Sequence, residues 1–130
     1  MKEILASQLN ENIFELIGEE WMLVTAERQG KVNMMTASWG ALGVFWNKPA
    51  ATIYIRQSRY TKEFIDSSER FSLCFFESQY RRMLGMCGTK SGRDIDKIKE
   101  SALTLKDVDG VPYFEEARMV FVCKKIFNQK

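Results

Sequence analysis

The sequence predicts a mainly β fold, a closed or partly closed antiparallel barrel of six or seven strands with short inserted helices. Its apolar residues change between alternating and helical spacing along the chain. No Pro- or Ser-rich linker, charge block or internal repeat divides the 130 residues, of which 45% are hydrophobic. We therefore expect one domain over residues 1–130, large enough to bury a core.

The first strands follow from alternation and from turn residues. Residues 21–28 alternate and are partly β-branched, Gln29-Gly30 is typical of a turn, and residues 31–35 complete a hairpin. After a stretch of small residues and a turn at 47–49, residues 51–56 alternate Ile with Thr, Tyr and Arg, which predicts a strand.

Two helices and a strand are expected in the middle of the chain. Residues 58–67 predict a short helix that a hydroxyl residue opens, and residues 70–76 predict a strand. The next helix should end at Gly88, because glycine is common where helices stop. Its apolar positions recur at helical spacing and are Tyr80, Met83, Leu84 and Cys87.

The last third predicts a helix and three strands. Ser91 and Asp94 have the spacing of a capping box ahead of a helix whose apolar positions are Ile95, Ile98 and Ala102. Two short strands should then turn at Asp109-Gly110, and a long strand should cover residues 117–127.

Composition excludes several classes of function. Nineteen basic against 17 acidic residues give a net charge of +2, too little for a nucleic-acid partner. No apolar run approaches the ~20 residues that cross a bilayer, and the first residues lack a signal peptide's apolar stretch. We expect no membrane partner and a cytoplasmic protein.

Histidine is absent, so every catalytic pair that needs it is excluded. Cys74, Cys87 and Cys123 are odd in number and widely spaced, which favours reduced, mostly buried thiols over disulfides or a metal site. The carboxylates of Asp94 and Asp96, and of Glu115 and Glu116, are interpreted as a helix cap and a solvated turn. We assign no catalytic side chain and no metal ligand.

Two clusters combine basic and hydroxyl side chains at loops or helix starts. Both suit a phosphate, which needs charged donors, hydroxyl donors and free backbone N–H groups. Ordinary solvated loop charges are the alternative. The resemblance of the second cluster to a nucleotide-binding P-loop fails, because Thr89 stands before Lys90 and Leu84 replaces the required glycine. The clusters are Arg56, Ser58, Arg59, Tyr60 and Thr61, and Thr89, Lys90, Ser91 and Arg93.

A third feature is the small-residue segment Thr36-Ala37-Ser38-Trp39-Gly40. Small residues between strands let a flat ring approach the main chain, whose N–H and C=O groups can bond its polar edge. A tight barrel corner with Trp39 as core filler is the alternative from the residues alone.

Four blocks in order resemble the flavin reductase-like, flavoredoxin-type proteins. They are Asn33 to Gly40, Asn47-Lys48-Pro49, Arg56 to Thr61, and Cys87 to Asp94. The resemblance implies the FMN-binding split barrel, a Greek-key antiparallel β-barrel that forms a homodimer with one FMN in each of two intersubunit clefts. Relatives of this kind usually continue for some tens of residues beyond the point where this chain stops.

Carried over block by block, the resemblance implies which residues bind FMN. It puts the ring edge against Thr36, Ala37, Ser38 and Trp39, and the phosphate against Arg56, Ser58, Tyr60 and Thr61. Lys90, Ser91 and Arg93 would complete the pocket.

Three functions follow as hypotheses. The first is an FMN-dependent oxidoreductase that takes electrons from NADH or NADPH. The second is a non-catalytic electron carrier or flavin-binding module, reduced by a redox partner protein. The third is an interaction domain whose basic loops bind an anionic surface, which the near-neutral charge disfavours.

Overall fold

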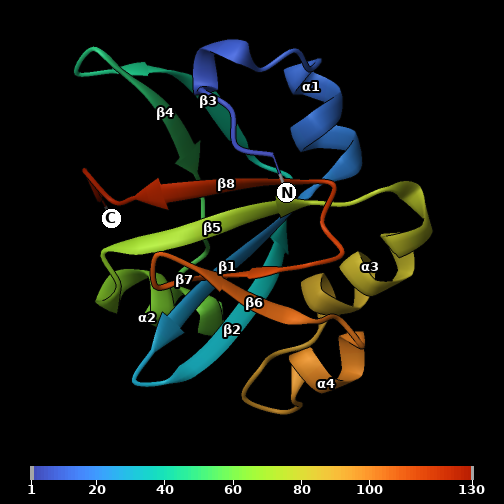
Figure 1. The fold of residues 1–130 in the computed structure, drawn as a ribbon. Coiled ribbons are helices and arrows are strands. Elements are labelled where there is room, and N and C mark those ends of the chain that lie inside the picture. Colours follow the sequence, from blue (N-terminus) through green and yellow to red (C-terminus); the bar gives the residue numbers. More distant parts are fainter. Residues whose placement is uncertain (1, 130) are drawn as a thin grey trace.

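An antiparallel four-stranded sheet in the order β2-β1-β5-β8 forms the centre of the fold (Figure 1). The computed structural model describes residues 2–129, so residues 1 and 130 of the predicted domain lie outside the described residues. The strands of this sheet are β1 (Met22–Arg28), β2 (Lys31–Ala37), β5 (Arg70–Phe75) and β8 (Met119–Lys124). β2 is therefore an edge strand.

Both faces of this sheet are buried, which explains why residues 22–26 of β1 are all inaccessible. Met22 and Val24 face one core cluster, and Leu23 faces the other, as the two-residue period of a strand requires. α1 (Ile13–Glu15), with the wide helical turn Leu16–Glu20 that continues it, and α2 (Tyr60–Ser67) cover the first face. α3 (Arg81–Thr89) and β7 (Val111–Phe114) cover the second face.

Two hairpins complete the β structure, β3 (Gly40–Phe45) with β4 (Lys48–Ile53) and β6 (Leu105–Val108) with β7 (Val111–Phe114). Figure 1 shows the β3–β4 hairpin projecting away from the central sheet. Both predicted hairpin turns are confirmed. The central residues Gln29-Gly30 and Asp109-Gly110 all have positive φ, the geometry that matches the twist of the flanking strands.

The main error of the sequence prediction is β3, because no strand is expected in the stretch of small residues that precedes the turn at 47–49. Gly40, Ala41 and Gly43 have low strand propensity, so the local strand signal of this segment is weak. Gly40 is needed because a Cβ there would lie 2.6 Å from the backbone oxygen of Thr52 across the hairpin. The turn falls at Trp46-Asn47, β4 covers 48–53 instead of 51–56, and the described residues form eight strands.

The helix starts also differ from the prediction. α2 begins at Tyr60 without a side-chain cap, and α3 runs one residue past Gly88. The capping box at Ser91 and Asp94 is wrong: these residues form a turn, and α4 (Lys97–Ser101) is capped by the Asp96 carboxylate, which accepts from the backbone N–H of Lys99. The final strand is shorter than residues 117–127.

Cys74 and Cys87 are buried and Cys123 is half-buried, as predicted. Among residues 2–129, no helix has the length and apolar character that crossing a membrane requires.

Candidate functional site

The turn before α2 and the loop between α3 and α4 meet and form a groove of about 210 Å³. These two segments meet because β2 is an edge strand. α2 lies on one face of the sheet and α3 on the other, and their ends come into contact around the edge that β2 forms. Residues from both predicted clusters line this groove. They are Ser58, Arg59, Thr89, Lys90, Ser91, Arg93 and Lys97.

The lining is strongly cationic. Four of its seven residues carry a basic side chain, the other three carry hydroxyls, and none is acidic. Such a set offers a dianion charged donors from several directions and neutral donors between them. The chemistry of the donors therefore fits a phosphate monoester.

The carbonyl end of α3 holds the groove together. The last four carbonyls of a helix have no partner within it, and positive charges are favoured there. Arg59 donates to the Gly88 oxygen at 2.9 Å and to the Cys87 oxygen at 3.4 Å. Lys97 donates to the same Cys87 oxygen at 2.9 Å. The two groove segments are thus bound to one helix end.

The end of β2 is attached to the same helix. The Thr36 hydroxyl donates to the Leu84 oxygen at 2.5 Å. A Cβ on Gly88 would lie 3.3 Å from the Cβ of Thr36, so glycine at this position permits the close approach of α3 to β2. The predicted ring-edge segment, which begins at Thr36, is therefore positioned by the helix that also positions the groove.

Lys97 is the functional candidate that sequence reasoning missed. It is only 3% exposed, and its ammonium donates to the oxygens of Met34 at 2.8 Å and Cys87 at 2.9 Å. Burial lowers its pKa to about 8. In the helix expected around Ile95, Ile98 and Ala102, Lys97 lies off the apolar face, so the periodicity gives no sign that it is buried.

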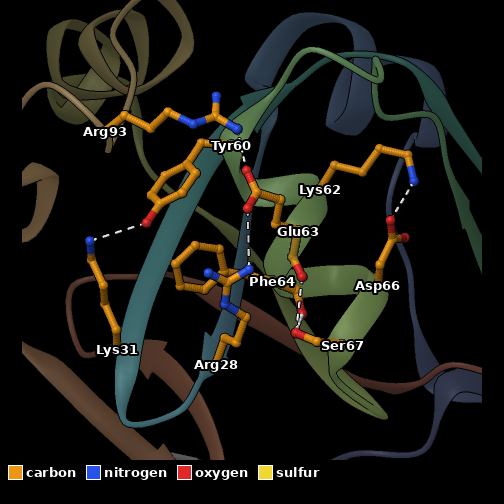
Figure 2. Close-up of polar contacts among 9 residues, drawn as sticks. All are labelled: Arg28, Lys31, Tyr60, Lys62, Glu63, Phe64, Asp66, Ser67 and Arg93. Atoms are coloured by element: carbon orange, nitrogen blue, oxygen red, sulfur yellow. Dashed lines mark hydrogen bonds and ion pairs between the residues drawn. The ribbon is translucent and has the colours of Figure 1, made fainter.

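Arg93 connects the groove to the outer face of α2 (Figure 2). Its guanidinium lies 4.7 Å from the centre of the Tyr60 ring and pairs with the Glu63 carboxylate, which also accepts from Arg28 at 3.2 Å. Desolvation by itself would raise the pKa of Glu63. Hydrogen bonds from Arg93 and Arg28 outweigh it and hold the pKa below its ordinary value. The Tyr60 hydroxyl accepts from Lys31 at 3.2 Å.

The remaining predicted residues lie outside the lining of this groove. Thr61 is buried and its hydroxyl accepts a hydrogen bond from the Asn33 amide at 2.9 Å, so its side chain stabilises the fold. Arg56 is exposed and lies 5.4 Å from the ring centre of Trp39, which is 60% exposed. Trp39 is therefore not core filler.

The other two members of the ring-edge segment differ in exposure. Ala37 is buried at the end of β2, whereas Ser38 is exposed. Arg59 and Thr89, which were assigned to the clusters but not to the pocket, line the groove. The four predicted pocket residues found there are Ser58, Lys90, Ser91 and Arg93.

Comparisons with known proteins show which family and which solved structures this chain is similar to. The sequence model of the flavin reductase-like domain matches residues 15–127. A search of curated proteins finds no match. Among solved structures, an FMN-binding domain of a flavin reductase-like enzyme from Shewanella baltica is 24% identical, with a TM-score of 0.77 over 88% of this chain and 62% of that chain.

Two flavoredoxins are similar to the same extent. The one from Methanosarcina acetivorans is 25% identical, with a TM-score of 0.76 over 85% of this chain and 59% of that chain. The one from Desulfovibrio vulgaris is 23% identical, with a TM-score of 0.79 over all of this chain and 69% of that chain. This chain spans less than two thirds of the first two structures.

Proposed function

Because the chain belongs to the flavin reductase-like domain family, we propose that it binds FMN noncovalently and holds the FMN phosphate in the groove at the end of α3. The groove carries this proposal: four basic and three hydroxyl side chains line it without a carboxylate. The Shewanella protein, which is described as FMN-binding, and the two flavoredoxins support it.

Each group of residues has a distinct task in this proposal. Ser58, Arg59, Lys90, Ser91 and Arg93 hold the phosphate by charge-assisted and hydroxyl hydrogen bonds. The segment from Thr36 to Trp39 presents backbone amides to the polar edge of the ring. Bound FMN supplies hydride and electron transfer, so the protein's part is binding and orientation.

We further propose that the chain is an oxidoreductase that takes electrons from NADH or NADPH. The FMN-loaded protein, mixed anaerobically with either nucleotide, should lose its visible flavin absorbance. Stopped-flow absorbance measures this change. A flavin that both nucleotides leave coloured, while a low-potential chemical donor reduces it, would contradict this activity and favour an electron carrier that a partner protein reduces.

A homodimer is the proposed assembly, and the β3–β4 hairpin is its proposed contact. Val44 is 79% exposed and Trp46 at the hairpin turn is 64% exposed. Trp46 and Asn47, with φ values of 53° and 61°, form the two-residue turn at the tip of this hairpin. The ring of Phe45 lies 5.8 Å from that of Phe127, which is 59% exposed, so the apolar surface continues onto the C-terminal segment.

Val44→Asp should therefore convert a dimer into a monomer, because a carboxylate in an apolar interface loses its hydration without gaining a partner. Light scattering coupled to size-exclusion chromatography measures the mass. Val108→Asp, at a 37%-exposed valine on β6, is the matched control and should leave the mass unchanged. A monomeric unsubstituted protein, or a dimeric Val44→Asp variant, would contradict the proposed contact.

A further inference from the structure

The Lys97 ammonium has more donors than the protein uses. An ammonium group carries three N–H donors, and the oxygens of Met34 and Cys87 accept two of them. Within residues 2–129, the Lys97 ammonium forms no further hydrogen bond. Lys97 also lines the groove, next to the space that the phosphate would occupy.

The surroundings of Lys97 do not neutralise its charge. A buried charge is costly unless an opposite charge pairs with it, and its two bonded partners are neutral carbonyls. Burial, opposed by the charge of Lys97, raises the pKa of the nearby Cys87 thiol to about 11, so the thiol is neutral at pH 7. The Asp96 carboxylate is engaged with the N–H of Lys99 at 3.2 Å. The other charged groups at this groove are Arg59, Lys90 and Arg93.

We infer that Lys97 is a specificity-determining residue that makes the groove prefer phosphorylated flavin to riboflavin. Its charge lies beneath the phosphate and its third N–H donates to it. Its two carbonyl bonds join β2 to the end of α3 and so fix the ammonium in place. This inference rests on the proposed function, because it assumes that the groove holds the FMN phosphate.

The inference predicts a pH dependence of FMN binding. Burial lowers the pKa of Lys97 to about 8 in the free protein, so the ammonium loses its proton as the pH rises above that value. A bound dianion favours the charged form and raises this pKa. The FMN phosphate, with a second pKa of about 6, is already a dianion above pH 7. The affinity for FMN should therefore fall as the pH rises through 8. The affinity for riboflavin, which has the same ring without the phosphate, should stay constant.

Dissociation constants of FMN and riboflavin, measured by flavin fluorescence between pH 7 and 9.5, test this inference. The preference of the unsubstituted protein for FMN should fall roughly 10- to 30-fold over this range, since one proton contributes at most about tenfold per pH unit. This titration needs no variant and so does not depend on whether a variant folds.

Two substitutions assign the effect to Lys97. Lys97→Met should lower the preference for FMN at pH 7 by roughly 10- to 100-fold, the value of a hydrogen bond to a charged group, and should remove the pH dependence. Lys97→Arg keeps its charge throughout the range and should retain the preference at pH 9.5. Thermal unfolding of each variant verifies its fold.

The possible failures can be told apart. The role of Lys97 alone would be overturned if FMN binds but its preference over riboflavin does not change with pH. The same holds if a folded Lys97→Met variant shows the same pH dependence of this preference as the unsubstituted protein. If neither flavin binds the unsubstituted protein at any pH, the proposed function itself fails.

Discussion

Arg59→Ala is expected to weaken FMN binding by roughly 100-fold or more, the largest loss among single groove substitutions. A hydrogen bond to a charged group contributes about 1.5–3 kcal/mol, and the guanidinium offers several such donors to the phosphate. The same side chain donates to the oxygens of Gly88 and Cys87, so its removal also releases the α3 end from the turn before α2. Isothermal titration calorimetry with FMN measures the loss.

Two further variants make this prediction specific. Arg82→Ala removes an exposed arginine from the first turn of α3, outside the groove lining, and should leave the FMN dissociation constant within about twofold. Arg59→Lys keeps the charge but loses the planar fork that reaches two acceptors, so its affinity should be intermediate. If Arg59→Ala binds FMN as tightly as Arg82→Ala does, the phosphate does not lie in this groove.

Gly92→Ala is expected to damage both stability and binding. An added Cβ would lie 2.3 Å from Oδ1 and 2.8 Å from Cγ of Asn33, distances that real Cβ atoms do not show. Asn33 is 3% exposed and donates to the Thr61 hydroxyl at 2.9 Å, so it cannot move without losing that bond. Overpacking of this kind costs about 1–3 kcal/mol of unfolding free energy. Urea denaturation should show a loss of this size.

The displaced loop also carries Lys90, Ser91 and Arg93 away from the groove. FMN should therefore bind at least about tenfold more weakly to Gly92→Ala, because the loss of one charged contact has this effect. Gly85→Ala is the matched control, because a Cβ there meets nothing within 4 Å and alanine is the better helix former. It should raise the unfolding free energy by up to about 1 kcal/mol. Equal stabilities of the two variants would contradict the contact between Gly92 and Asn33.

Local chemistry explains which parts of the fold were predictable. The first strand and the turns at Gln29-Gly30 and Asp109-Gly110 depend on a few neighbouring residues, and all three are present in the structure, although both faces of β1 are buried instead of one. β3 was missed because its glycines and alanine have little strand propensity of their own. Gly40 is favoured there by the close approach of Thr52, a residue on another strand.

The candidate site, like the fold, has features that could be predicted from the sequence and features that could not. The amino-acid sequence by itself determined the fold family and the two basic, hydroxyl-rich clusters, because residue types and short motifs are visible along the chain. Only the tertiary structure decided that Arg59 rather than Arg56 faces the groove and that Lys97 is buried beneath it. The physical reason is that both side chains are directed by unpaired carbonyls at the end of α3, which reach them only when the chain is folded around the edge of β2.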